Sequence, residues 1–157
     1  ASLELGEESN FSQHGIHPTM LLKEKNETLL FYQGWKRLTE YPYETAISLA
    51  KSIDDGLTFN QVNRSPVFQK SESDPYFVNG AFILPRDNDY IMYYSGGIKW
   101  LMNEEKKESV YVIKMATSTD LLDWRKCNVE IIRAKARNRS TAAVKKRQRR
   151  RKIVRKR

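Results

Sequence analysis

Cysteine is almost absent from this chain of 157 residues, because Cys127 is its only example. One cysteine cannot form an internal disulfide or supply the thiolates of a metal site, so we expect Cys127 to be a small buried side chain. Histidine is nearly as rare, and His14 and His17 lie three positions apart with no third ligand in motif spacing. We therefore predict no metal site, and no cofactor.

Long apolar runs are also lacking. No segment approaches the roughly 20 consecutive apolar residues that span a bilayer. The chain also does not begin with a basic segment followed by an apolar one, which is the pattern of a secretory leader. The sequence therefore predicts a soluble protein without a membrane span, and we expect it in the cytoplasm.

Acidic residues are missing from the last part of the chain. All 19 Asp and Glu residues lie at or before Glu130, whereas 14 of the 28 Lys and Arg residues lie from Arg133 onward. The segment 1–132 thus has a net charge of −5, from 14 basic and 19 acidic side chains, and the segment 133–157 has +14. We predict two regions: a folded domain, 1–132, and a basic low-complexity tail, 133–157, that is disordered or helical.

Within the first region, two segments repeat one another. The run Thr28–Gly34 is echoed by Tyr90–Gly96, and Ala50–Asp54 is echoed by Ala116–Asp120. A repeat of about sixty residues, written in short aromatic and β-branched runs, is typical of stacked β-units such as propeller blades.

Each repeat is expected to form about four strands. The expected order is strand, hairpin, aromatic strand, long loop, Ala-x-Ser strand, tight turn and a short edge strand. The two long loops are predicted at Gly34–Thr45 and Gly96–Ser109. The candidate strands are short and rich in β-branched or aromatic residues: Thr19–Leu22, Leu29–Trp35, Ala46–Ser52, Phe82–Leu84, Tyr90–Gly96, Val110–Ser118 and Val129–Ile132.

Aromatic residues gather on or near the predicted loops. Exposed rings at one end of a β-scaffold suit a sugar-binding cleft, because the apolar face of a pyranose stacks on them. An alternative is that these rings only cover the ends of the sheets. The candidate substrate-binding residues are Trp35, Tyr41, Tyr43, Tyr76 and Trp100.

Several motifs follow one another in an order that resembles a known family. Between Phe11 and Ile132 the chain is similar to glycosidase-like five-bladed β-propeller proteins, which are related to the arabinanase/xylosidase, invertase/levansucrase and mannoside-phosphorylase families. The motifs that support this resemblance are Phe31-Tyr32-Gln33-Gly34-Trp35, Tyr41-Pro42-Tyr43-Glu44-Thr45-Ala46, Ser65-Pro66-Val67-Phe68, Asp74-Pro75-Tyr76-Phe77, Met92-Tyr93-Tyr94-Ser95-Gly96 and Ala116-Thr117-Ser118.

The resemblance implies carbohydrate as the partner, bound in a cleft at the propeller axis. Glycoside cleavage there requires two carboxyl groups, one protonated and one ionised. By resemblance, Asp74 is expected to be an orienting or pKa-tuning acid, or the base; the alternative is a simple Asp-Pro turn. Glu44 and His14 are the further catalytic candidates, because Glu44 follows an aromatic loop motif and His14 stands where relatives tend to carry an acid. For Glu44 the alternative is a role outside the cleft.

The match is incomplete, because the repeat occurs twice where a closed ring needs five blades. We therefore expect an all-β partial propeller of about two four-stranded blades, a fragment whose catalytic set is incomplete. The open blade edges are expected to favour self-association.

The basic tail suggests a second, different function. Its densest part would neutralise phosphates without reading sequence, which predicts non-specific binding to nucleic acid or another anionic surface. The residues concerned are Lys145, Lys146, Arg147, Arg149, Arg150, Arg151 and Lys152.

Overall fold

The structure is a computed structural model that describes residue 3 and residues 10–132. The predicted basic tail lies outside the described residues, together with its candidate nucleic-acid-binding side chains. The described part is all-β, with eight strands and no helix. No helix in this part is therefore long and apolar enough to cross a membrane.

The eight strands form two antiparallel sheets of four, each in sequence order. We call them unit one and unit two. Unit one contains β1 (Gly15–Glu24), β2 (Glu27–Lys36), β3 (Glu44–Ser52) and β4 (Asn60–Gln61). Unit two contains β5 (Val78–Pro85), β6 (Tyr90–Asn103), β7 (Lys106–Ser118) and β8 (Arg125–Ile132). The prediction of four strands in each repeat is confirmed.

One of the two predicted long loops is wrong. Gly34–Thr45 does contain a connection, which joins β2 to β3. Gly96–Ser109, however, continues both strands of a hairpin, with Trp100 paired to Ser109 and Asn103 to Lys106. A slip in register between Gly97 and Lys99 allows β6 to pass the glycines and remain paired.

Equivalent turns end the third strand of each unit. The Ser52 hydroxyl accepts from the Gly56 N–H at 2.8 Å, and the Ser118 hydroxyl accepts from the Leu121 N–H at 3.0 Å. In each turn the aspartate two positions later accepts the serine hydroxyl, and in unit one that aspartate is Asp54. Serine and aspartate form such local bonds readily, so the repeated Ala-x-Ser-x-Asp motif encodes the turn.

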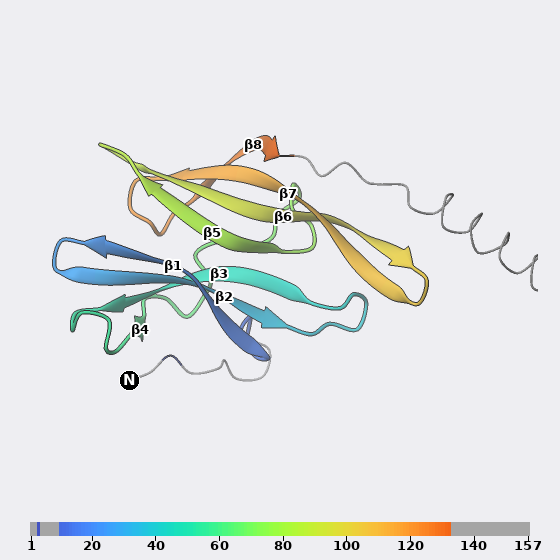
Figure 1. Cartoon of the computed structure of the whole chain (residues 1–157), viewed down its shortest axis with the longest axis horizontal. Coiled ribbons are helices and arrows are strands. Elements are labelled where there is room, and N and C mark those ends of the chain that lie inside the picture. The colour runs from blue at the N-terminus through green and yellow to red at the C-terminus, as the bar shows by residue number, and fades with distance from the viewer. Residues whose placement is uncertain (1–2, 4–9, 133–157) are drawn as a thin grey trace, which may run out of the picture.

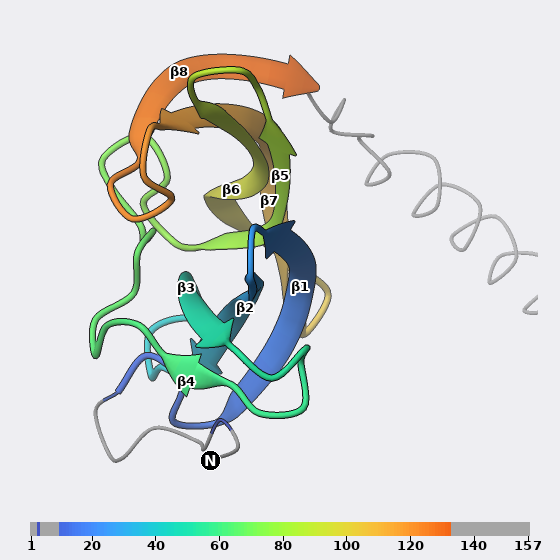
Figure 2. The same cartoon turned by 90° about the vertical axis from the view of Figure 1, so that its left-hand side faces the viewer.

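The two units pack face to face, as Figures 1 and 2 show, and the apolar core lies between them. Polar contacts also join them: the Thr45 hydroxyl donates to the Val78 carbonyl at 2.8 Å. The segment between β4 and β5 closes one side, because Phe68 exchanges two backbone hydrogen bonds with Ile47 of β3. The core includes Leu29, Phe31, Ile47 and Leu49 of unit one and Val78, Ile83, Met92, Tyr94 and Ala116 of unit two.

Candidate functional site

The predicted site residues lie at one end of the two sheets. His14 precedes β1, and Asp74 and Tyr76 precede β5. Trp35 lies near the end of β2, Tyr41 and Tyr43 lie in the connection to β3, and Glu44 begins that strand. Trp100 lies in the extended half of β6, toward the β6–β7 turn. Because antiparallel neighbours alternate in direction, these positions all belong to the same end.

Four of the five predicted aromatic residues meet there. Trp100 is at their centre, with its ring centroid 5.1 Å from Tyr43, 6.4 Å from Tyr41 and 6.5 Å from Tyr76. Tyr41 and Tyr76 also contact each other edge to face at 5.4 Å. All four side chains are half-buried, so each packs against its neighbours and keeps part of its surface in solvent. We call these residues, together with Phe77 and Tyr111, the aromatic cluster.

Phe77 and Tyr111 were not predicted as members, because they lie in a strand or directly before one rather than in a long loop. Phe77 is fully buried and lies 5.9 Å from Trp100, which anchors the cluster to unit two. Tyr111 lies 6.4 Å from Phe77 and remains exposed. A sequence signal was available for Phe77, since it follows Tyr76 directly in the Asp-Pro-Tyr-Phe motif.

Both units contribute to the cluster because the β6–β7 hairpin lies against the β2–β3 connection. The Lys107 ammonium donates to the Glu40 carbonyl. The hydroxyls of Tyr43 and Ser109 are 3.4 Å apart, in hydrogen-bond contact. Figure 1 shows the hairpin extending beyond the other strands of unit two, on the side of this connection. The long hairpin is therefore what brings Trp100 to the tyrosines.

Trp35 is the predicted aromatic residue that does not join the cluster. Its ring lies 5.9 Å from His14 and 5.9 Å from the Arg37 guanidinium. The His14 ring is exposed, and its Nδ1 accepts the Arg37 backbone N–H at 3.3 Å. Trp35 and His14 thus form a separate pair at the edge of unit one.

Asp74 is fully buried, with 0% of its surface exposed, and two lysines hold it. Lys114 of β7 and Lys126 of β8 each place Nζ 2.8 Å from one of its carboxylate oxygens. The Tyr94 hydroxyl donates to the same carboxylate at 3.1 Å. Lys126 also donates to the Ser71 hydroxyl at 2.8 Å and lies 4.8 Å from the centre of the Phe68 ring.

This arrangement keeps Asp74 ionised. Burial alone would raise the pKa of Asp74, but the hydrogen bonds and charges of Lys114 and Lys126 outweigh it and leave the pKa below its ordinary value. Burial also lowers the pKa of Lys126 and, with the adjacent Asp74 charge, raises that of Tyr94. The carboxylate therefore has no proton to donate near neutral pH, which fits an orienting or structural acid better than a general acid.

A glycine makes room for this carboxylate. A Cβ atom at Gly96 would lie 2.1 Å from Asp74 Oδ1, far inside contact distance. Gly96, which ends the repeated segment Tyr90–Gly96, therefore has to be a glycine because Asp74 approaches it so closely.

Glu44 is half-buried and forms an ion pair with Lys70 at 2.6 Å. Within the described residues, no hydrogen bond or ion pair joins Asp74, Glu44 and His14 to one another. The structure therefore does not bring the three catalytic candidates together. The described residues also contain no group of three or more His, Cys, Asp or Glu that could hold a metal ion.

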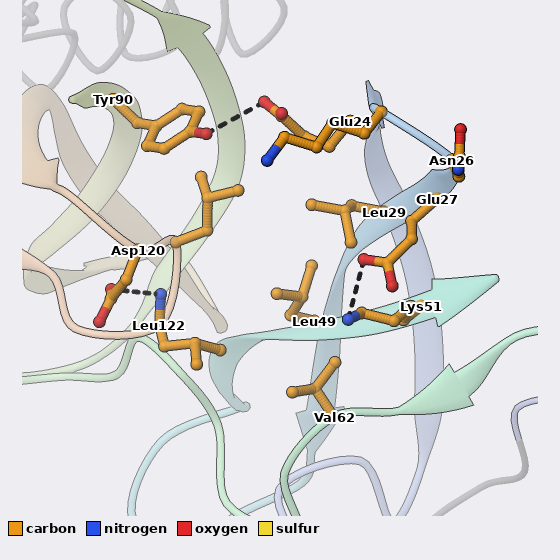
Figure 3. A pocket seen from close by; sticks show the side chains of 12 residues that line it. Glu24, Asn26, Glu27, Leu29, Leu49, Lys51, Val62, Tyr90, Asp120 and Leu122 are labelled. Carbon is orange, nitrogen blue, oxygen red and sulfur yellow. Dashed lines mark hydrogen bonds and ion pairs between the residues drawn. The ribbon is translucent and has the colours of Figure 1, made fainter. Parts of the chain in front are cut away.

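A pocket of about 500 Å³ lies at the opposite end of the sheets. Figure 3 shows it between the units, with apolar side chains such as Leu29, Leu49 and Val62 inside and charged ones at its rim. Tyr90 reaches across and donates to Glu24 at 3.1 Å, while Lys51 pairs with Glu27 at 2.8 Å. None of the predicted site residues lines this pocket.

The lysines that hold Asp74 were also missed from sequence. Lys114 interrupts the apolar run Val112-Ile113-Lys114-Met115-Ala116, and a lysine on the inward side of a strand signals a buried partner. Lys126 gave no such signal, because it stands between Arg125 and Cys127 and interrupts no apolar run, and its partner comes from a distant segment.

Comparison with known proteins gives relatives in sequence and in fold, although no family model matches the chain. Two Mycobacterium tuberculosis proteins, the uncharacterised proteins MT1551 (strain CDC 1551) and Rv1502 (strain H37Rv), are each 27% identical over 124 residues. The match takes in 79% of this chain and 40% of each relative, so the chain spans less than half the length of the curated relatives it matches.

The similar solved structures are glycoside hydrolase-like proteins. One is a glycosyl hydrolase from Bacteroides ovatus, with 22% identity and a TM-score of 0.53 over 71% of this chain and 30% of that one. Another has 19% identity and the same score and coverage. Its description says that the GH130 family of mannoside phosphorylases contains glycoside hydrolases targeting β-1,2 mannosidic linkages in Candida mannan. At these identities the likeness is one of fold.

Proposed function

We propose that this chain binds carbohydrate, and that the aromatic cluster is the surface on which the sugar lies. The single observation that carries the proposal is the gathering of Tyr41, Tyr43, Tyr76 and Trp100, from two different units, at one end of the scaffold. The glycoside hydrolase-like structural neighbours support the same substrate class.

The chemistry of the cluster suits a sugar. Half-buried rings that are fixed by their neighbours offer an apolar face at a small cost in conformational entropy. The hydroxyls of Tyr43 and Ser109 lie close together beside those rings and can exchange hydrogen bonds with sugar hydroxyls. Such a site combines stacking with polar contacts, as carbohydrate recognition requires.

We further propose that the two units are blades of a partial propeller, with the cluster beside its axis. The repeat, the order of strands in each unit and the fold neighbours support this arrangement. Carbohydrate would then approach from the end at which β5 begins, close to Asp74.

Binding without turnover is the activity we propose for this chain by itself. Hydrolysis needs a second carboxyl group within roughly 5–10 Å of the first, on the opposite side of the bond. Asp74 is buried and paired with two lysines, and Glu44 is paired with Lys70. Neither is arranged as a proton donor, so we assign Asp74 the role of ordering the segment that carries Tyr76 and Phe77.

Isothermal titration calorimetry tests the proposal with a panel of β-1,2-mannobiose and manno-, arabino-, xylo- and fructo-oligosaccharides. We expect one of these sugar classes to bind, and Trp100→Ala to weaken that binding at least tenfold, about 1.4 kcal/mol. Trp35→Ala is the matched control, because Trp35 lies outside the cluster, and it should change affinity less than about twofold.

Two results would contradict the proposal. One is the absence of binding to every sugar by a chain that circular dichroism shows to be folded. The other is an equal loss in Trp100→Ala and Trp35→Ala, which would mean that the cluster is not the site. Nucleic-acid binding by the basic tail stays a prediction from sequence.

A further inference from the structure

The ammonium group of Lys126 directs three hydrogen bonds to a single segment. It donates to the Gln69 carbonyl, the Ser71 hydroxyl and the Asp74 carboxylate, each at 2.8 Å. An ammonium group has three donors and no acceptor, so these bonds use its whole hydrogen-bonding capacity. All three partners lie in segment 69–74 of the connection between β4 and β5, whereas Lys126 itself belongs to β8.

Segment 69–74 depends on such polar contacts for its position, because most of it is exposed. Its own backbone forms a tight turn, in which Ser71 and Asp74 exchange two hydrogen bonds at 3.2 and 3.0 Å. Lys126 reaches this turn because it is paired with the fully buried Ala116, so both side chains lie on the inner side of unit two. A segment with few buried apolar contacts is held mainly by the groups that bond to it.

Two other lysines hold the same turn. Lys114 donates to the Ser73 carbonyl at 2.6 Å and pairs with the Asp74 carboxylate at 2.8 Å. Lys70 lies within the turn and pairs with Glu44 of β3. The turn is therefore tied to both units, at the place where the chain approaches β5.

The aromatic cluster follows this turn directly. Pro75 comes next, and its ring fixes φ, so the orientation of the turn passes to Tyr76 with little freedom. The Tyr76 ring lies 5.4 Å from Tyr41 and 6.5 Å from Trp100. On its other side Tyr76 is followed by the fully buried Phe77. Its ring therefore lies between two fixed points, and release of the turn would free one of them.

The equivalent segment of unit one lacks both the carboxylate and the ammonium group. When Thr28–Gly34 is aligned with Tyr90–Gly96 and the alignment is continued toward the N-terminus, Asp74 corresponds to Ser12 and Tyr76 to His14. The counterpart of Lys126 by strand register is Gln61, which is exposed. His14 is also exposed and lies outside the aromatic cluster. The unit that has the lysine-bonded turn is thus the one that places a ring from this position in the cluster.

We propose that Lys126 is a positioning residue for carbohydrate binding, which acts through segment 69–74 to hold Tyr76 against Tyr41 and Trp100. This inference rests on the proposed function of the aromatic cluster. The ammonium group bonds to the turn, so its effect reaches the sugar through Tyr76. A ring that loses its fixed position must be ordered when the sugar binds, and this cost lowers affinity.

The spectrum of the chain without sugar tests whether Lys126 positions Tyr76. Lys126→Met keeps most of the side-chain length and removes the three donors. In a ¹H–¹⁵N correlation spectrum we expect the Trp100 indole signal to move, because the Tyr76 ring shifts beside it, while the Trp35 signal stays in place. Lys51→Met is the matched control, since the ion pair of Lys51 lies at the opposite end of the sheets, and it should leave both signals unchanged.

Isothermal titration calorimetry then measures the effect on binding, with the sugar that the unaltered chain binds. The temperature is one at which circular dichroism shows the variants to be folded, because lost stability alone does not change the affinity of a folded chain. We expect Lys126→Met to raise the dissociation constant at least about fivefold. Lys51→Met should change it less than about twofold, since its ion pair is exposed.

Ser71→Ala is the second variant if Lys126→Met fails to fold, because it removes one acceptor and leaves the ion pair of Lys126 with Asp74 intact. It should move the Trp100 signal in the same direction by a smaller amount.

An unmoved Trp100 signal in a folded Lys126→Met chain would overturn the inference, and Lys126 would then only stabilise the fold. A moved signal with an unchanged dissociation constant would overturn it too, because the position of Tyr76 would then not affect the sugar. If the unaltered chain binds no sugar, the proposed function fails, and the Trp100 signal alone decides whether Lys126 positions Tyr76.

Discussion

Unit one and unit two follow the same backbone path but bury different polar groups at the same place. In unit two, Asp74, Tyr94 and Lys114 form a charged network. In the alignments of the repeat, the counterparts in unit one are Ser12, Tyr32 and Ser48, which are all buried and uncharged. The glycines correspond as well, since a Cβ at Gly34 would lie 2.7 Å from the Ser12 Cβ.

The positions of Asp74 and Lys114 differ together between the units, which suggests that the two positions are coupled. A buried carboxylate needs a buried cation, so losing one charge without the other would leave an unpaired ion inside the protein. Both charges are present in unit two, and both are replaced by serine in unit one. The repeat therefore specifies the backbone, whereas the buried polar groups vary as a matched set.

Removal of the Asp74 carboxylate is the change with the largest expected effect. Asp74→Ala leaves two lysines without their buried partner, and we expect the free energy of unfolding to fall by about 3–5 kcal/mol. Ser12→Ala, at the counterpart position, should cost about 1 kcal/mol because no charge is stranded. Urea denaturation of both variants measures the difference, and equal losses would contradict the distinction between the units.

Replacing Asp74 and Lys114 by the serines found at the equivalent positions of unit one tests whether the two positions are coupled. Asp74→Ser alone should be strongly destabilising, and adding Lys114→Ser should recover about 1–2 kcal/mol, since the second change removes a stranded charge. The double-mutant cycle gives the coupling energy from urea denaturation. Strict additivity of the two changes would show that the positions are independent.

The two glycines should differ in their tolerance of a methyl group. In Gly96→Ala the new Cβ meets Oδ1 of the Asp74 carboxylate, which Lys114 and Lys126 hold through its two oxygens, so we expect a cost of about 3 kcal/mol. In Gly34→Ala it meets the half-buried ring of Phe11 and the Cβ of Ser12, and neither side chain is fixed by an ion pair, so a smaller cost of about 1–2 kcal/mol is expected. Thermal unfolding monitored by circular dichroism ranks the two, and a reversed order would contradict the account.

The smallest expected effect is on the dependence of stability on pH. The pKa of Asp74 is lowered in the folded chain, so its ionisation adds stability above the ordinary carboxyl pKa of about 4, and that stability is lost as pH falls further. Asp74→Asn should therefore flatten the fall in unfolding free energy between about pH 4 and pH 2. Ser12→Ala should keep the original slope, and an unchanged slope in Asp74→Asn would be inconsistent with a lowered pKa.

The sequence predicted the repeated four-stranded units because their local chemistry agrees with the fold. The Ser-x-Asp turns close themselves through their own side chains, and the aromatic strands carry the period-two pattern. The stretch from Gly96 to Ser109 was wrongly predicted to be a long loop, because its glycines and mixed charges give it the composition of one. Only its cross-strand pairing, which depends on both halves together, makes it a hairpin.

The candidate site was predicted in part. Aromatic residues on connections gave four members of the cluster, but their convergence depends on how the β6–β7 hairpin lies on unit one, which local patterns do not encode. The ion pairs of Asp74 were missed for the same reason. The motif that contains Asp74 was recognised, but the distant Lys126 becomes its partner only through the strand order of unit two. Cys127 is half-buried, rather than buried as expected.

The most direct test of carbohydrate binding by the aromatic cluster uses the three tryptophans as reporters. Trp35 lies at the edge of unit one, Trp100 in the cluster, and Trp124 against Phe31 at the core. Each indole N–H gives one signal in a ¹H–¹⁵N correlation spectrum, assigned by Trp→Phe replacement. On titration with the sugar that binds, we expect the Trp100 signal to move in a saturable way while Trp35 and Trp124 stay in place. A shift at Trp35 with Trp100 unchanged would contradict our account.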